Sequence, residues 1–297
     1  MKTIMFLSHK GGVGKTTCAF QTAFGLPFVL SGGELPSVEH PNVHSRVLLI
    51  DLDEQCELSQ RIVNDYQSSP EYLAANGFRT LLDFISVTGD ETTSLTDALR
   101  ACVLHTGLVD VILGSYDGES VMAMFDNNPK LLRERLALLS KEYDVCILDS
   151  PPGRVSAQTA GILACDYAFP CSDEHDGGLR GVRDAINDVN TANAQMGGRV
   201  AVPLVMVRKD SVPFDEEAWY ASELKKITKV EPFFLRYDPM LLREVAKTGN
   251  LLYTYSQKTL ARQFAYFCVQ IVGGLLRQPL RQPGFPPFTA FYVRGGK

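Results

Sequence analysis

The sequence contains no long apolar run and no paired cysteine motif. None of its apolar runs reaches the roughly 18 residues that a membrane-spanning helix needs, which argues against a helix across a bilayer. Its 7 cysteines are scattered without a Cys-x-x-Cys pair, so we expect neither a disulfide framework nor a zinc site. A reducing cytoplasm is the simplest setting for such cysteines. Residues 1–4 run straight into an apolar stretch, so we expect no signal peptide.

Acidic residues are missing from one region of an otherwise acidic chain. The net charge is −5, which argues against a protein coated in nucleic acid. From Val245 to the C-terminus there is no Asp or Glu, and the basic residues there are Lys247, Lys258, Arg262, Arg277, Arg281, Arg294 and Lys297. This acid-free segment is interpreted either as a phosphate-backbone contact surface for non-specific DNA or as an ordinary solvated basic face.

The sequence does contain a glycine-rich phosphate loop, Lys-Gly-Gly-Val-Gly-Lys-Thr-Thr, at residues 10–17. Residues 3–7 before it have strand character, and residues 18–26 after it are good helix formers, which is the context in which such a loop works. Backbone N–H groups and the helix dipole then favour an anion at this point. The predicted nucleotide-binding residues of the loop are Lys10, Gly11, Gly12, Val13, Gly14, Lys15, Thr16 and Thr17.

Two side chains of this loop have specific predicted roles. Lys15 supplies a point charge for the outer phosphates, and the Thr16 hydroxyl is a predicted magnesium ligand. The usual pattern would begin with glycine at position 9, where this chain has His9. The loop is therefore a variant, and it carries a second lysine, Lys10.

Aspartates follow two further apolar runs. Residues 47–50 lead into Asp51 and Asp53, and residues 143–148 lead into Asp149 and a Ser-Pro-Pro-Gly turn. Ligands of doubly wound sheets bind at the carboxyl ends of the strands, so these acids are expected to face the phosphate loop. An aspartate in this position can hold a magnesium-bound water. No cysteine occurs in residues 150–164, which weakens an iron–sulfur interpretation.

These motifs resemble those of the ParA/MinD group of deviant Walker A ATPases. Residues 10–17 match its phosphate loop at every position, residues 51–55 resemble its Asp-x-Asp-Pro-Gln segment with Glu54 in place of proline, and residues 149–153 resemble a Walker B strand end. The resemblance implies that Lys10 crosses a homodimer to contact the partner's phosphates. It also implies that Asp51 and Asp149 serve the magnesium, that Asp53 positions the attacking water, and that Arg208 lies near the adenine base.

The same resemblance implies the fold and the activity. The expected fold is a doubly wound, mostly parallel α/β sheet flanked by helices, a P-loop NTPase with ATP and Mg²⁺ as cofactors. The implied function is a dimerising ATPase that binds non-specific DNA, partitions a cargo and is stimulated by a ParB-like partner, in a cytoplasmic and nucleoid-associated setting. Two alternatives remain: a MinD-like positioning ATPase at a membrane or protein partner, and a nucleotide-dependent scaffold that barely hydrolyses ATP.

The remaining sequence predicts one ATPase domain with two additions. The chain has 297 residues with 45% hydrophobic and 21% charged side chains, which suits a single globular α/β domain at residues 1–277. Residues 27–45 are predicted to be a loop insertion, in which His40 and His44 are surface residues, and residues 278–297 a proline-rich tail. The prolines of the tail exclude the C-terminal amphipathic helix with which MinD-like relatives attach to membranes.

Periodicity and turn residues predict the other elements. Helices are expected at residues 80–85, 94–103, 129–143, 216–227 and 256–276, and strands at residues 109–114, 169–171, 200–207 and 233–235. Pro203 suggests that its strand is an edge strand or contains a bulge. Asp173 or Glu174 is either a contact to the partner or, as we favour, a plain helix-start acid, and His175 is expected at the surface.

Overall fold

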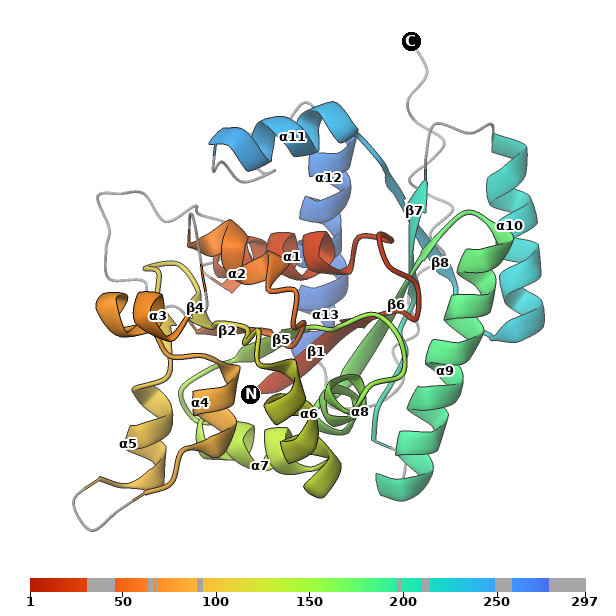
Figure 1. Cartoon of the computed structure of the whole chain (residues 1–297). Coiled ribbons are helices and arrows are strands. Elements are labelled where there is room, and N and C mark those ends of the chain that lie inside the picture. Colours follow the sequence, from red (N-terminus) through yellow and green to blue (C-terminus); the bar gives the residue numbers. More distant parts are fainter. Residues whose placement is uncertain are drawn as a thin grey trace.

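An eight-stranded sheet forms the centre of the molecule (Figure 1). The computed structural model describes residues 1–30, 46–63, 67, 69–89, 93–196, 199–209, 214–248 and 258–277. The strand order is β3-β4-β2-β5-β1-β6-β7-β8. The strands are β1 (Lys2–Leu7), β2 (Val47–Asp51), β3 (Leu104–His105), β4 (Asp110–Ile112), β5 (Val145–Asp149), β6 (Tyr167–Asp173), β7 (Val205–Lys209) and β8 (Pro232–Arg236).

All strand pairs are parallel except β3 with β4, which confirms the predicted fold class. The central strands are buried on both faces, which explains why they are continuous apolar runs. Helices at Leu81–Ser86 and Leu95–Arg100 confirm the predictions for residues 80–85 and 94–103, although the second helix ends three residues earlier than predicted. The two-residue strand β3 lacks a periodic signal and was missed.

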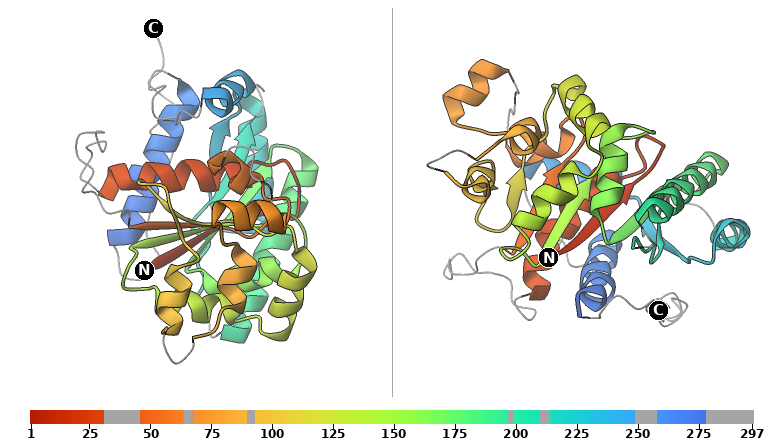
Figure 2. Two further views of the ribbon diagram at one scale, coloured as in Figure 1. Left: turned by 60° about the vertical axis from the view of Figure 1, so that its left-hand side comes forward. Right: turned by 90° about the horizontal axis from the view of Figure 1, so that it is seen from below.

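Helices cover both faces of the sheet (Figure 2). One face packs against α1 (Lys15–Leu30), α2 (Glu57–Ile62), α12 (Thr259–Tyr266), the π-helix η2 (Phe267–Val272) and α13 (Gly273–Arg277). The other face packs against α4 (Leu81–Ser86), α5 (Leu95–Arg100), α6 (Gly118–Asn127), α7 (Leu131–Leu138), α8 (Ser156–Ala164) and α9 (Asp176–Met196). The remaining helices are α3 (Pro70–Asn76), α10 (Phe214–Ile227) and α11 (Pro239–Thr248).

Helix α1 extends further than predicted. The predicted insertion began at Pro27, but the helix continues through this proline to Leu30. Proline removes only its own N–H donor from the helix, and the preceding turns are held by Ala19, Ala23 and Leu26, which are fully buried against the sheet. The rest of the predicted insertion, residues 31–45 with both of its histidines, lies outside the described residues.

Two other segments differ from their predictions. Strand β7 begins at Val205, after Pro203, and lies between β6 and β8, so the expectation of an edge strand was wrong. The alternative expectation, a bulge, is confirmed: Ala201 pairs with Tyr167 and Met206 with Cys171, so four steps along β6 face five steps along the segment with Pro203. Proline cannot donate to the ladder, so the pairing that begins at Ala201 is interrupted at Pro203 and resumes in β7. Helix α7 ends at Leu138 rather than near residue 143, because the N–H groups of Leu139 and Ser140 bond three residues back, as in a tightened last turn.

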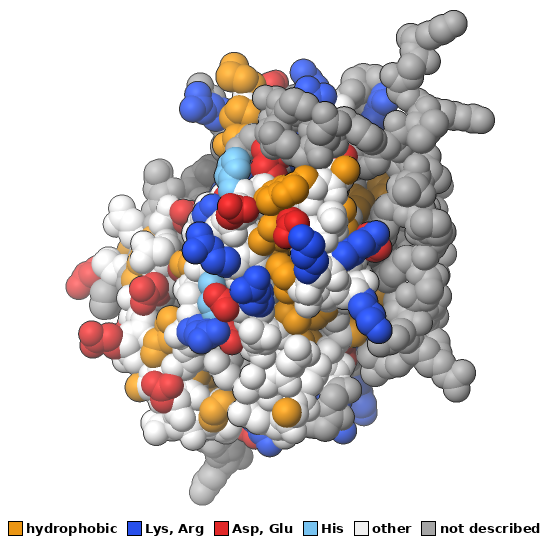
Figure 3. All heavy atoms as spheres, turned by 90° about the vertical axis from the view of Figure 1, so that its right-hand side faces the viewer, with side chains coloured by type: hydrophobic (Ala, Val, Ile, Leu, Met, Phe, Trp, Pro, Cys, Tyr) orange, Lys and Arg blue, Asp and Glu red, His pale blue; other side chains and the backbone are white. Residues whose placement is uncertain are grey.

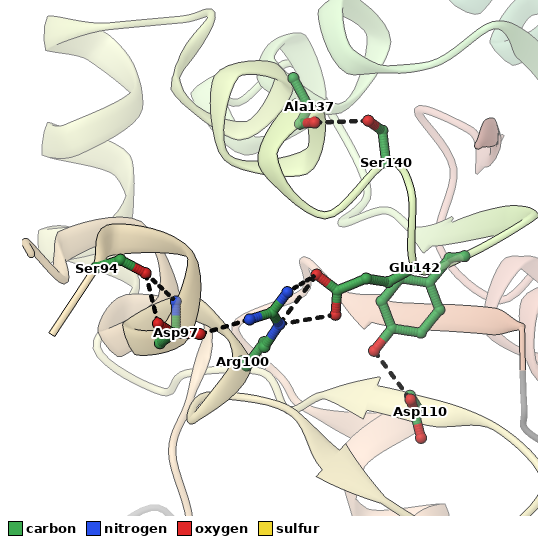
Figure 4. Close-up of polar contacts among 8 residues, drawn as sticks. Ser94, Asp97, Arg100, Asp110, Ala137, Ser140 and Glu142 are labelled. Atoms are coloured by element: carbon green, nitrogen blue, oxygen red, sulfur yellow. Dashed lines mark hydrogen bonds and ion pairs between the residues drawn. The ribbon is translucent and has the colours of Figure 1, made fainter.

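Polar contacts tie α5 to the chain just before β5 (Figure 4). The Ser94 hydroxyl accepts from the Asp97 N–H at 3.2 Å and so caps α5. At the other end of α5, the Arg100 Nε donates to both Glu142 oxygens at 3.0 Å. The hydroxyl of the next residue, Tyr143, donates to Asp110 of β4 at 2.9 Å. These contacts fix the strands that end at the functional site.

The predicted closing helix is present as α12, η2 and α13. Its apolar stripe is core, as expected, because Leu260, Phe264, Phe267 and Leu275 are at most 4% exposed. Among the described residues, no helix is both long and apolar enough to cross a bilayer. The predicted tail, residues 278–297, lies outside the described part of the chain.

Candidate functional site

The glycine-rich loop joins β1 to α1 at the carboxyl end of the central strand. Gly12 has φ +73° and Gly14 has φ +94°, the left-handed region that favours glycine. A side chain at either position would meet no atom within 4 Å, so the backbone conformation, and not space, requires glycine here. Helix α1 then begins at Lys15, and its N-terminal N–H groups lie beside the loop. This is the arrangement that binds a phosphate.

Lys15 is the buried cation of this site, with 6% of its surface exposed. Burial raises the pKa of both Asp53 and Asp149, and the positive charge of Lys15 offsets part of that rise at each carboxyl, so the three side chains share one electrostatic environment. The residues come from three separate segments: the phosphate loop, the turn after β2 and the end of β5. The predicted gathering of these residues is therefore present.

Asp149 ends β5 as a fully buried carboxylate. It is 1% exposed, and neither of its oxygens has a hydrogen-bond partner of standard geometry among the described residues. Burial and the neighbouring Asp51 raise its pKa well above the ordinary value, while Thr16 and Lys15 lower it. An orphaned carboxylate next to a threonine hydroxyl fits a hard divalent cation such as Mg²⁺.

Asp51 lies opposite Asp149 in the register of β2 and β5, but its surroundings differ. It is fully buried, and its Oδ2 accepts from the Ser59 N–H at 3.0 Å and the Ser59 hydroxyl at 2.7 Å. Its Oδ1 accepts from the Asp53 N–H at 3.1 Å. Burial raises the pKa of Asp51 to about 6 despite these hydrogen bonds. Both oxygens are thus already occupied by donors of the chain.

Asp53 is the most accessible of the three acids. Its Oδ1 accepts from the Gln55 N–H at 3.0 Å, and burial raises its pKa above the ordinary value. The residue stands two positions beyond the end of β2, on the turn that leads to α2. Its carboxylate therefore lies next to the phosphate loop without being fixed in the core.

Lys10 and Asp173 form an ion pair within one chain. The Lys10 Nζ contacts Asp173 Oδ2, with the lysine side chain 41% exposed and the aspartate side chain 5% exposed. Asp173 is the last residue of β6, so the favoured expectation of a plain helix-start acid was wrong. The strand continues two residues beyond its predicted end and carries the carboxylate to the phosphate loop. His175 is exposed, as expected.

Arg208 reaches the phosphate loop from β7. Its Nη1 donates to the Gly12 carbonyl at 2.5 Å, and its guanidinium lies 4.9 Å from the centre of the Tyr237 ring. A contact to the adenine base remains a prediction. Tyr237, which sequence reasoning missed, is 38% exposed and follows β8. No motif marks it, because only the pairing of β7 with β8 brings it to the loop.

His9, the residue in place of the usual glycine, anchors the loop to α9. Its Nε2 lies 2.5 Å from Asp188 Oδ2, and the Gln158 amide of α8 lies 3.4 Å from both groups. A cavity of about 350 Å³ borders this contact, with Asp126, Arg154 and Ser156 in its wall. No sequence motif marks these contacts, which join segments up to 179 residues apart.

Fold and loop together define a P-loop nucleotide-binding protein. Residues 1–202 match the AAA domain family, and because this is more than half of the 297 residues, the chain belongs to that family. The curated proteins that it resembles include ParA family proteins. The resemblance inferred from residues 10–17 is therefore confirmed.

Two relatives and one solved structure illustrate the similarity. The maintenance of carboxysome distribution protein A of Gloeothece citriformis is 30% identical over 167 residues, which are 56% of this chain and 54% of that protein. A virulence plasmid ParA family protein of Chlamydia muridarum is 27% identical over 179 residues, 58% and 55% of the two chains. The matched region thus spans about half the length of these relatives. An ATP complex of a substituted McdA from Cyanothece superposes with a TM-score of 0.71 at 21% identity, covering 95% of this chain and 99% of that one.

Proposed function

We propose that the protein is an ATP-dependent, dimerising ATPase that positions or partitions a cargo on non-specific DNA. The observation that carries the proposal is the convergence of Lys15, Asp53 and Asp149 beside a phosphate loop with two left-handed glycines. Such sites act by positioning and by electrostatic stabilisation of the transferred phosphoryl group. The plasmid and carboxysome relatives support a cargo-positioning role.

The residues of the site fit a magnesium ion. The orphaned Asp149 carboxylate and the Thr16 hydroxyl would hold it or its waters, and Asp51 adds negative charge behind them. When bound, Mg²⁺ neutralises charge on the phosphates. Lys15 contacts the outer phosphates in this proposal, and Asp53 orients the attacking water from its half-exposed position on the turn after β2.

Lys10 is assigned to the dimer. Its side chain is 41% exposed, long and flexible, and lies at the rim of the phosphate loop, from which it can reach a second nucleotide. ATP between two such loops would complete each site with a lysine of the partner subunit. A further protein, acting as a stimulator, would then trigger hydrolysis and release.

The acid-free C-terminal segment is the proposed DNA-contact surface. Lys258, which precedes α12, and Arg262 on α12 are exposed, whereas the other five basic side chains lie outside the described part of the structure. On the face with α9 and α10, Lys and Arg side chains are mixed with Asp and Glu (Figure 3), which does not favour a polyanion there. Binding of DNA would place the ATP dimer on the nucleoid.

Two assays test the proposed function. Hydrolysis of ATP by the wild type should need Mg²⁺ and fall by at least 100-fold in Lys15→Ala and Asp53→Ala. Equal, slow hydrolysis by the wild type and Asp53→Ala would instead indicate a nucleotide-dependent scaffold.

Fluorescence anisotropy with a random-sequence DNA duplex tests the DNA contact. The protein should bind the duplex only with ATP, and the affinity should fall as the salt concentration rises. Absence of DNA binding in every nucleotide state would indicate instead that the ATPase acts at a protein or a membrane.

A further inference from the structure

The two buried aspartates at the ends of β2 and β5 differ in what their oxygens do. Both Asp149 oxygens lack a standard hydrogen-bond partner among the described residues, whereas Asp51 accepts three hydrogen bonds from the segment that follows β2. A fully buried carboxylate that already accepts three hydrogen bonds from the chain is less available as a direct ligand than one that accepts none. The Asp51 contacts instead hold together the segment that follows β2.

Ser59 is the centre of these contacts. It is fully buried on α2, and its N–H and hydroxyl both donate to Asp51 Oδ2. The Ser59 hydroxyl oxygen also accepts from the Gly114 N–H at 2.8 Å, just after β4. The Gly114 backbone packs closely on Asp51, since a Cβ there would lie 3.0 Å from the Asp51 carboxyl carbon. Ser59 thus joins the ends of β2 and β4 to α2.

The other Asp51 oxygen fixes the turn that carries Asp53. Asp51 Oδ1 accepts from the Asp53 N–H, and the Asp53 carbonyl accepts from the Cys56 N–H at 3.0 Å. Cys56 closes the turn with φ +52°, a left-handed conformation that a non-glycine residue adopts only when its surroundings impose it. The orientation of Asp53 therefore depends on Asp51, and that of Asp51 on Ser59.

We infer that Ser59 is a positioning residue: through Asp51 it holds the Asp53 turn in the geometry that orients the attacking water. Ser59 itself touches neither nucleotide nor metal. The inference rests on the proposed hydrolysis by Asp53, and it divides the acids into Asp149, which serves the metal, and Asp51, which serves the turn. Misplacement of a reacting group by about 1 Å costs up to 100-fold in rate.

The test compares Ser59→Ala with Ser59→Thr, which keeps the hydroxyl, and with Ser94→Ala, which removes the cap of the distant helix α5. Ser59→Ala should lower the single-turnover rate of ATP hydrolysis 10- to 100-fold, with Mg·ATP affinity within about threefold of the wild type. Ser59→Thr should recover most of the rate, and Ser94→Ala should leave it unchanged. A wild-type rate in Ser59→Ala, or a loss of Mg·ATP binding as large as that of Asp149→Asn, would overturn the inference.

Amide hydrogen exchange tests the positioning separately from hydrolysis. In Ser59→Ala, exchange at the Asp53 and Cys56 N–H groups should accelerate at least tenfold, and in Ser94→Ala it should not. The exchange experiment can be read even if the wild type does not hydrolyse ATP. Such a result would refute the proposed function and leave the positioning role of Ser59 testable. Unchanged protection of both amides would overturn the positioning role. If Ser59→Ala does not fold, Asp51→Asn, which keeps only one acceptor oxygen for the same donors, should give the same exchange pattern, and unchanged exchange there would overturn it as well.

Discussion

At the residue scale, the site contains carboxylates of the same type in different environments. Asp51 is hydrogen-bonded on both oxygens, Asp149 lacks standard partners among the described residues, and Asp53 is partly open to solvent. Burying a carboxylate without partners is costly, so a protein keeps one where a bound cation or ligand compensates it. The free energy that it costs to bury the Asp149 carboxylate leads to a specific prediction about stability.

Asp149→Asn should leave the protein without nucleotide at least as stable as the wild type, because the change removes a buried acid beside Asp51. In the wild type, Mg·ATP at about 100 times its Kd should stabilise by about 2.7 kcal/mol and raise Tm by about 4 °C. The variant should lose the magnesium-dependent part of this shift. Thermal unfolding with ATP, with and without Mg²⁺, measures both effects.

A control for this prediction is Asp97→Asn, at an exposed aspartate on α5. It should keep the full shift with Mg·ATP. A drop of more than about 1 kcal/mol in the stability of nucleotide-free Asp149→Asn would show that this carboxylate has a structural partner.

At the element scale, the start of α9 lies tightly against the end of β6. Gly178 packs so closely that a Cβ would overlap the Asp173 carbonyl oxygen and the Ser172 hydroxyl. Asp173 in turn holds Lys10 of the phosphate loop. The closeness of helix and strand therefore sets the position of the loop cation.

Gly178→Ala should destabilise the protein by about 1–3 kcal/mol, because the new methyl group must push α9 away from a backbone atom. Gly181→Ala is the matched control one turn later, where the nearest atom to a Cβ is the Ser8 Oγ at 3.8 Å. That change should be neutral or stabilising by up to about 1 kcal/mol through helix propensity. Urea denaturation of both variants measures the difference, and equal midpoints would contradict the packing argument.

At the scale of the whole molecule, the chain presents an incomplete site. Lys10 is paired within its own chain to Asp173, but its side chain is 41% exposed. The proposed dimer gives this lysine a second anion to contact. Two-fold association around two nucleotides would make each site depend on the other subunit. The lysine is then more important for assembly than for folding.

Lys10→Ala should remain folded and lose dimerisation in the presence of ATP, as light scattering measures. Removing Lys10 leaves the Asp173 side chain, which is 5% exposed, without this cation and lowers the stability of the fold, but the apolar core around the sheet is unchanged. The charge missing at the partner's phosphates has no substitute. Lys141→Ala, at an exposed lysine after α7, is the control and should dimerise like the wild type. ATP-dependent dimers of Lys10→Ala would contradict the proposed contact across the dimer.

The sequence by itself determined the parts of the protein that local pattern encodes. The phosphate loop at residues 10–17 needs glycines and a lysine at set positions, so the motif can be recognised within one short stretch of sequence. The strands before Asp51 and Asp149 are continuous apolar runs because both of their faces are buried. Residues 10–17, 51–53 and 149 were therefore found together with the fold class.

Only the tertiary structure decided which groups these residues contact. Lys10 pairs with Asp173, 163 residues away, and Arg208 donates to Gly12 across 196 residues. No periodicity links such positions, and the partners are ordinary residue types whose proximity follows from the order of the strands. The contact of Ser59 with Asp51 is close in sequence but depends on the left-handed turn at Cys56, which propensity does not favour. Packing supplies the constraints that make these contacts, and packing is a property of the folded chain as a whole.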